Sequence, residues 1–194
     1  PGIPPNIVES REIPAREAVY GRLPENLHPG LLRVLESSGI TQIYSHQAAS
    51  FEAASSGLNV VMSTGTASGK SLGYQLPVLN TLLKDPSARA LFLFPTKALG
   101  NDQVRSMTDL LQRLNPISNA APIHAAAYDG DTPASQRSSI RAQARILLTN
   151  PDMLHIGILP HHTNWAEFFR NLRYVVIDEI HIYRGVFGAH LANL

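Results

Sequence analysis

A lysine and a serine follow a run of small residues, a combination suited to binding a nucleoside triphosphate. Residues 59–71 read NVVMSTGTASGKS. The loop is formed by small residues: Thr64, Gly65, Thr66, Ala67, Ser68 and Gly69. Small side chains let backbone N–H groups turn toward phosphate oxygens, and a helix that begins at the loop's end adds partial positive charge. We expect Lys70 to reach the β- and γ-phosphates of ATP and Ser71 to bind Mg²⁺.

This loop departs from the strict GxxxxGK[ST] pattern at one position. The pattern has glycine at position 64, where this chain has Thr64. Since a GKS tripeptide also occurs on ordinary turns, a plain turn is the alternative interpretation. A partner carboxylate elsewhere in the chain distinguishes the two.

Two carboxylates that could act together with the phosphate loop follow an apolar run near the end of the chain. Residues 174–179 read YVVIDE, so Asp178 and Glu179 stand at the end of a predicted strand. Open α/β sheets bind ligands at this end of their strands. We expect Asp178 to orient the Mg²⁺ shell and Glu179 to act as the general base for the attacking water. A solvated acidic turn is the alternative.

Strands and helices alternate along the chain and would bring these groups together. Apolar runs predict strands at 60–62, 90–94, 145–149 and 173–177, with a weaker strand at 124–127. Helical patterns cover residues 31–35, 46–55 (capped by Ser45), 70–83 (with Pro77 inside), 101–114, 134–143, 151–159 and 165–169. This alternation of almost wholly apolar strands with helices predicts an α/β fold with a doubly wound, mostly parallel sheet.

Composition limits the remaining possibilities. The chain has 194 residues, 44% of them hydrophobic, no cysteine and a formal net charge of +1. Without cysteine it forms neither disulfides nor thiolate metal sites. No apolar run approaches the length of a membrane span and nothing resembles a signal peptide, so we expect a cytoplasmic protein without a membrane partner. We expect an irregular, proline-rich arm over residues 1–28 and a single domain over 29–194.

Four short motifs together resemble a known family. TGTASGKS, PTKAL, TNPDML and DEIH stand in the order and spacing of motifs I, Ia, Ib and II of superfamily 2 helicases. Longer strings, TASGKS, FPTKAL, YDGDTP, TNPDMLH and VIDEIHIYRGVFG, resemble the YprA-type (MrfA-type) DExH-box DNA helicases, relatives of RecQ-like enzymes. Ile180 and His181 replace the last two residues of the DEAD motif, and Arg184 and Gly185 match the YprA-type pattern.

The resemblance implies a RecA-like domain, the first lobe of a helicase, with ATP and Mg²⁺ as cofactors. Gln47 stands at the Q-motif position, where its amide suits adenine's N6/N7 edge; a surface glutamine is the alternative. Tyr44 either stacks on the base or belongs to the core. His181 would couple the nucleotide site to the strand-separating parts of the protein, or is a satisfied polar group.

The resemblance also implies where nucleic acid binds. Two loops that follow strands would bind the sugar–phosphate backbone without reading sequence. The first loop contains Pro95, Thr96 and Lys97, and the second contains Thr149, Asn150 and Pro151. The YDGDTP turn either touches DNA or is a plain Asp-Gly turn. For Arg137, Arg141 and Arg145 we favour a solvated helix face, and for His161 and His162 a loop.

The expected function is the N-terminal ATP-binding lobe of an ATP-dependent DNA helicase that acts on single-stranded or tailed double-stranded DNA. The family pattern implies 3′-to-5′ movement, and it implies a second RecA-like lobe and a C-terminal region outside this chain. We expect the first lobe to be truncated here before motif III. The segment alone should hydrolyse ATP poorly, because the second lobe supplies the arginine finger. Alternatives are a nucleotide-gated, non-catalytic DNA-binding module and an RNA helicase or RNA-dependent ATPase.

Overall fold

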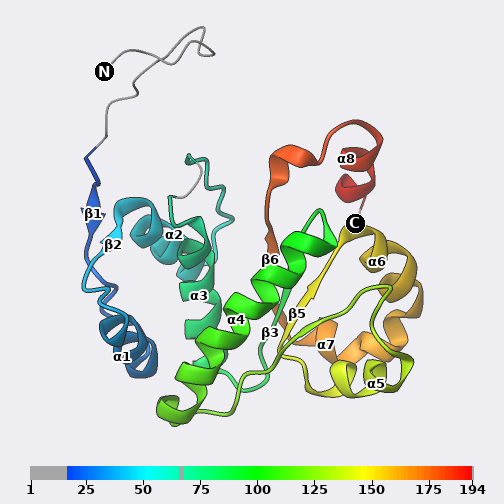
Figure 1. Ribbon diagram of the computed structural model, residues 1–194, viewed down its shortest axis with the longest axis horizontal. Coiled ribbons are helices and arrows are strands. Elements are labelled where there is room, and N and C mark those ends of the chain that lie inside the picture. Colours follow the sequence, from blue (N-terminus) through cyan, green and yellow to red (C-terminus); the bar gives the residue numbers. More distant parts are fainter. Residues whose placement is uncertain (1–16, 66–67, 194) are drawn as a thin grey trace, which may run out of the picture.

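A four-stranded parallel sheet forms the centre of the molecule (Figure 1). The computed structural model describes residues 17–65 and 68–193. The strand order is β4 (Ala125–Ala127), β5 (Ile146–Thr149), β3 (Arg89–Leu93) and β6 (Leu172–Ile177). Neighbouring strands run parallel throughout. The predicted α/β fold with a parallel sheet is therefore confirmed.

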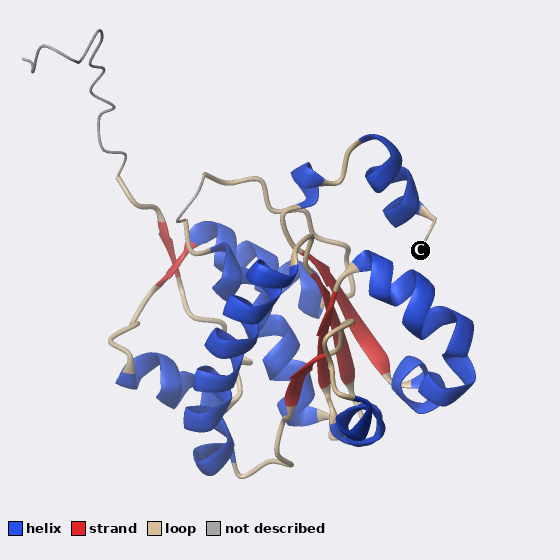
Figure 2. Cartoon of the chain, turned by 45° about the vertical axis from the view of Figure 1, so that its right-hand side comes forward, coloured by secondary structure: helices blue, strands red, loops and turns tan. Residues whose placement is uncertain are grey.

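Helices cover both faces of this sheet, as Figures 1 and 2 show. One face packs against α1 (Pro29–Ser37), α2 (Ser45–Ser55), α3 (Lys70–Lys84) and α4 (Lys97–Ser118). Over the other face lie α5 (Ala134–Gln143), α6 (Pro151–Met153), a π-helical turn (Leu154–Ile158), a 3₁₀ segment (Leu159–Trp165) and α7 (Ala166–Arg170). None of the described helices has the length and apolarity to cross a membrane.

Strand β3 shows why two cores form. Its side chains alternate between the faces of the sheet: Ala90 and Phe92 belong to one buried cluster, and Leu91 and Leu93 belong to the other. This alternation follows from the two-residue period of a strand. Because both faces are covered, the strand is apolar at every buried position, as its sequence predicted.

A small ribbon near the N-terminus was not predicted. Strands β1 (Tyr20–Gly21) and β2 (Ile43–Tyr44) pair in an antiparallel manner. Gly21 is required there, because a Cβ at this position would lie 2.8 Å from the Cβ of Ala48 in α2. The first sixteen residues lie outside the described part of the chain, so the arm predicted over 1–28 stays a prediction. Part of that arm nonetheless forms β1.

The buried strand predicted at residues 60–62 is wrong. Val61 is 83% exposed, and these residues have no strand conformation. A short apolar run becomes a strand only beside a partner, and within residues 17–65 and 68–193 no strand pairs with it. Met62 instead packs against α3, where its sulfur would lie 2.7 Å from a Cβ at Gly73.

Several further boundaries differ from the predictions. Helix α4 begins at Lys97 rather than Asn101, because the Thr96 hydroxyl accepts a hydrogen bond from Leu99 N and caps it. Ser45 lies inside α2 and does not cap it; the Gln47 side chain bonds Tyr44 N instead. Residues 159–165, with His161 and His162, form the 3₁₀ segment rather than a loop. Helix α8 (Gly185–Ala192) follows the last predicted element.

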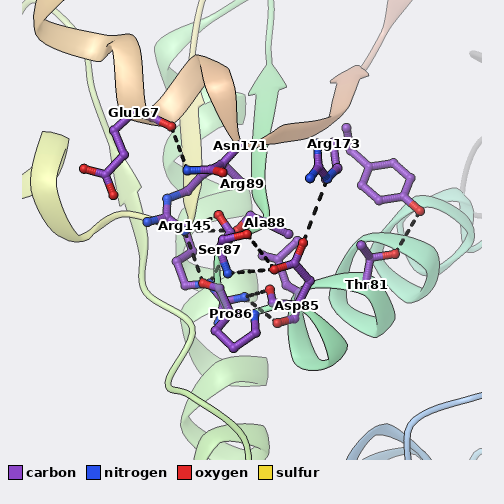
Figure 3. A network of polar contacts seen from close by, with 12 residues as sticks. Thr81, Asp85, Pro86, Ser87, Ala88, Arg89, Arg145, Glu167, Asn171 and Arg173 are labelled. Carbon is purple, nitrogen blue, oxygen red and sulfur yellow. Dashed lines mark hydrogen bonds and ion pairs between the residues drawn. The ribbon is translucent and has the colours of Figure 1, made fainter.

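Arg145 connects chain segments that lie at the amino ends of the sheet strands (Figure 3). Its guanidinium donates to the carbonyl oxygens of Leu82, Asp85 and Ala121 and is buried. Burial lowers the pKa of Arg145, and Arg89 adds to this effect. The solvated helix face favoured for this arginine is therefore wrong, because the buried guanidinium has several N–H donors and directs them to backbone carbonyls.

Candidate nucleotide and nucleic-acid sites

The predicted phosphate loop lies at the N-terminus of α3. Gly69 precedes the helix with φ +74°, a conformation that favours glycine. The Lys70 Nζ donates to the Thr64 carbonyl at 3.2 Å, and the hydroxyls of Thr64 and Ser68 are 2.6 Å apart. The loop therefore folds back over the start of α3, and the Lys70 ammonium group lies inside the turn. Gly65 is exposed, and Thr66 and Ala67 lie outside the described residues.

Gln47 connects α2 to this loop. Its side chain is 3% exposed; Nε2 donates to the Gly69 carbonyl at 2.7 Å, and Oε1 accepts from Tyr44 N at 2.8 Å. The alternative of a surface glutamine is therefore excluded. A Cβ at position 69 would lie 2.7 Å from Gln47 Nε2, a second reason for glycine there. One N–H and one lone pair of the amide remain for a ligand.

Aromatic rings border the same loop. The ring of Tyr44 stacks between those of Tyr20, at 5.4 Å, and His46, at 5.6 Å between centroids. Tyr44 is half-buried and lies 3.5 Å from a Cβ position at Gly69. It is therefore beside the nucleotide site rather than in the apolar core.

The two predicted carboxylates lie at the carboxyl end of β6. Asp178 N donates to the Leu93 carbonyl, so the backbone of Asp178 continues the pairing with β3. Its Oδ1 accepts from Glu179 N at 2.8 Å, and its Oδ2 accepts from the Tyr74 hydroxyl at 3.2 Å. Glu179 has a left-handed backbone with φ 51°, and its Oε2 lies 3.2 Å from Nδ1 of His181. His181 thus contacts the predicted base directly.

The Tyr74 hydroxyl lies near the two predicted Mg²⁺ ligands. It donates to Asp178 Oδ2 at 3.2 Å, and Tyr74 stands about one helical turn after Ser71 on α3. Burial raises the pKa of Tyr74. A serine hydroxyl and a carboxylate are hard oxygen donors, which Mg²⁺ prefers. No group of three or more acidic, histidine or cysteine side chains suited to a metal occurs in the described ranges. Since Mg²⁺ on a nucleotide takes most of its ligands from phosphates and water, the pair fits such an ion.

A neighbouring tyrosine responds to the same carboxylate. Burial raises the pKa of Tyr183 to about 12, and the charges of Asp178 and Asp152 contribute. The phenol of Tyr183 therefore stays protonated around neutral pH beside Asp178.

The two loops predicted to bind nucleic acid meet at one hollow. Its lining includes Thr96, Lys97, Asp129, Thr149 and Asn150. Both loops lead into helices: Thr96 caps α4, and Asn150 Oδ1 caps α6 by accepting from Met153 N at 2.8 Å. Two helix N-termini therefore point toward the same region, an arrangement that suits phosphate groups.

The side chains that line this hollow differ in how available they are to a ligand. The Thr149 hydroxyl is buried and donates to the Tyr128 carbonyl at 2.6 Å, so it first holds the neighbouring turn. Lys97 is exposed and pairs with Asp131 at 2.6 Å. Pro95 is half-buried and Pro151 is buried. The nucleic-acid roles of all six residues stay predictions.

The YDGDTP turn is held internally. Arg137 donates to the carbonyls of Thr132 and Asp129, at 3.1 and 3.2 Å, and its guanidinium lies 5.2 Å from the ring centre of Tyr128. Arg137 is therefore a support for this turn.

Tyr74 and Asp131 were missed in the sequence. Tyr74 lies within the helix predicted at residues 70–83, but no role was predicted for it. Its spacing of three residues from Ser71 carried a usable signal, because residues three apart share a helix face. Asp131 gave no such signal, since its contact with Lys97 spans 34 positions.

Comparison with known proteins agrees with this geometry. The DEAD/DEAH box helicase family profile matches residues 44–194. The chain is 44% identical over 189 residues to the uncharacterized ATP-dependent helicase YprA of Bacillus subtilis, covering 97% of this chain and 25% of YprA. It is 44% identical over 180 residues to the ATP-dependent helicase HRQ1 of Saccharomyces cerevisiae, covering 93% of this chain and 16% of HRQ1.

Solved structures give the same result. A crystal structure of the DUF1998 helicase MrfA bound to DNA and AMPPNP matches with a TM-score of 0.90 and 45% identity, over 97% of this chain and 26% of that one. The Mycobacterium smegmatis helicase Lhr bound to ssDNA and AMP-PNP matches with a TM-score of 0.74 and 26% identity, over 87% and 22%. The chain thus spans about a quarter or less of these relatives. By the match of its sequence and its parallel sheet, this chain belongs to the DEAD/DEAH box helicases, and it is similar to helicases of the YprA/MrfA type.

Proposed function

We propose that this chain is the N-terminal ATP-binding lobe of an ATP-dependent DNA helicase. One observation carries the proposal: the Tyr74 phenol, one turn after Lys70 on α3, donates to Asp178 Oδ2 at 3.2 Å, so the helix that follows the phosphate loop meets the carboxylate at the end of β6. This is the meeting of phosphate loop and strand-end carboxylate that ATP hydrolysis requires.

Each residue has a role in this mechanism. The Lys70 ammonium leaves the Thr64 carbonyl for the β- and γ-phosphates of ATP, and backbone N–H groups of residues 64–69 bind the remaining oxygens. Ser71 and Asp178 would hold Mg²⁺, which neutralises developing phosphate charge when bound. Glu179 accepts the proton of the attacking water, and His181, 3.2 Å from this carboxylate, orients it.

The nucleic acid is proposed to lie across the hollow formed by the loops after β3 and β5. The helix N-termini at Thr96 and Asn150 and the Lys97 charge contact phosphates without reading bases. DNA is favoured over RNA because the MrfA structures are described as bound to DNA. Single-stranded or tailed double-stranded DNA as substrate, 3′-to-5′ movement, a second RecA-like lobe with a C-terminal region, and a cytoplasmic location belong to this proposal.

The proposal is tested by ATP hydrolysis with the full-length protein that carries this chain. Rates are measured with single-stranded DNA, with single-stranded RNA and without nucleic acid, for the natural protein and for Glu179→Gln. We expect DNA to stimulate hydrolysis and Glu179→Gln to remove it while ATP still binds. Stimulation by RNA alone would favour an RNA-dependent ATPase. Absence of turnover, with nucleotide-dependent DNA binding, would favour a non-catalytic module.

A further inference from the structure

The Tyr74 hydroxyl faces two acceptors on two different elements. Its oxygen lies 3.2 Å from Asp178 Oδ2, at the end of β6, and 3.4 Å from Gln103 Oε1, on α4. A phenol has one proton and can donate one strong hydrogen bond at a time. The two acceptors therefore compete for the same donor.

The ring that carries this hydroxyl is held firmly. Tyr74 is half-buried and packs edge-on against Phe92 of β3, with 5.8 Å between ring centres. The phenol projects from α3, one turn after Lys70 and the phosphate loop. Because the ring is fixed, the hydroxyl proton can change partner without movement of the side chain.

Tyr74 thus touches the elements that serve the two proposed ligands. Asp178 belongs to the nucleotide side. Gln103 lies in α4, the helix that begins at Thr96 and Lys97 and whose start lines the proposed nucleic-acid hollow. The Tyr74 phenol thus contacts both β6, through Asp178, and α4, through Gln103.

We propose that Tyr74 is a positioning residue that couples nucleotide binding to nucleic-acid binding, by passing its hydrogen bond between Asp178 and Gln103. The inference rests on the proposed function. While Asp178 is free, the ionised carboxylate is the stronger acceptor and holds the proton. When Asp178 turns to the nucleotide-bound cation, the proton passes to Gln103 and fixes α4 in one position.

Coupling of this kind is reciprocal. If nucleotide fixes α4 through Tyr74, nucleic acid that fixes α4 must raise nucleotide affinity by the same factor. Removal of the hydroxyl alone should weaken that factor while leaving each ligand able to bind. The coupling factor is therefore the quantity to measure.

The chain supplies a matched control. The Tyr174 hydroxyl lies 3.0 Å from Thr81 Oγ1 and also joins β6 to α3, near the amino end of β6 and away from Asp178. Tyr174→Phe removes the same O–H between the same two elements, with no carboxylate or α4 residue involved. Gln103→Leu removes the second acceptor and leaves the Tyr74–Asp178 contact.

The experiment uses the full-length protein in a Glu179→Gln background, so that ATP is not consumed. The affinity of a fluorescent ATP analogue is measured with and without a single-stranded DNA oligonucleotide, over a range of Mg²⁺ concentrations. We expect the ratio of the two affinities to fall about fivefold in Tyr74→Phe and in Gln103→Leu, the size of one hydrogen bond, and to stay unchanged in Tyr174→Phe.

Two results would overturn the inference: a ratio in Tyr74→Phe equal to that of the unsubstituted protein, or an equal fall in Tyr174→Phe. The proposed function is checked separately by DNA-stimulated hydrolysis in the protein with Glu179 intact. If that hydrolysis is absent, the proposed function fails. If it is present and the affinity ratio does not respond to Tyr74→Phe, the coupling role alone fails.

Discussion

The Nζ atom of Lys97 lies 2.6 Å from Oδ2 of Asp131, so the start of α4 is paired with the turn after β4. This hydrogen bond raises the pKa of Lys97. Both side chains are largely exposed, and such pairs contribute little to stability. Under the proposed function, the Asp131 carboxylate competes with the phosphates of nucleic acid for the Lys97 ammonium.

Asp131→Asn should strengthen binding of single-stranded DNA about two- to fivefold at low salt, because the Lys97 charge no longer needs to leave a carboxylate. Fluorescence anisotropy over a salt series measures this effect. The control is Asp102→Asn, which removes the same charge from an exposed position on α4. Equal gains in both variants would show a general charge effect and contradict a specific role for Asp131.

Lys70→Ala should reduce DNA-stimulated hydrolysis by at least about a hundredfold, because it removes the side-chain charge assigned to the β- and γ-phosphates. Steady-state phosphate release by the full-length protein measures it. Lys84→Ala provides the control, since Lys84 ends the same helix and donates only to the Asn26 carbonyl. Turnover of Lys70→Ala within a few-fold of the unsubstituted rate would mean that the phosphate loop is wrongly assigned.

Gln47→Glu should weaken ATP and GTP binding alike by about tenfold. The substitution places a carboxylate oxygen where Nε2 donates to the Gly69 carbonyl, and two acceptors facing each other cost free energy. Titration calorimetry with both nucleotides tests it, beside Gln42→Glu, which changes an exposed glutamine. A loss confined to ATP would instead show that Gln47 acts only on the adenine base.

Arg145→Met should destabilise the amino ends of the sheet strands by about 2–3 kcal/mol, because the carbonyls of Leu82 and Ala121 lose the hydrogen bonds from this side chain. Hydrogen exchange by mass spectrometry on the full-length protein would show faster exchange at the start of β3 and β5. Arg141→Met, on the half-exposed side of α5, should leave exchange there unchanged. Equal protection in both variants would refute the role given to Arg145.

Much of the fold followed from local patterns. The helix at residues 134–143 was predicted with its exact bounds, and α3 and β3 within one residue, because periodicity and flanking turns agree there. The placement of Asp178 at a strand end also followed from the apolar run before it, although Val175 and Ile177 of β6 are exposed. These features depend on neighbours in the sequence.

Contacts between residues that are distant in sequence could not be predicted from local patterns. Val61 resembles a strand residue, but strand formation depends on a partner and not on the residue itself. Arg145 and Arg141 have the same chemical character, and only the packing of distant carbonyls separates the buried one from the half-exposed one. Tyr74 meets Asp178 across 104 positions, a relation that no periodicity encodes.

The backbone of Glu179 has a consequence for the balance between stability and activity. Two non-glycine residues in the described chain have positive φ, Asn119 and Glu179. Asparagine tolerates that conformation, whereas glutamate pays about 1 kcal/mol for it. Glycine at this position would relieve that cost and remove the proposed base. If Glu179 is the base, as proposed, Glu179→Gly would give a more stable but inactive domain, and the strained backbone is the cost of keeping that carboxylate.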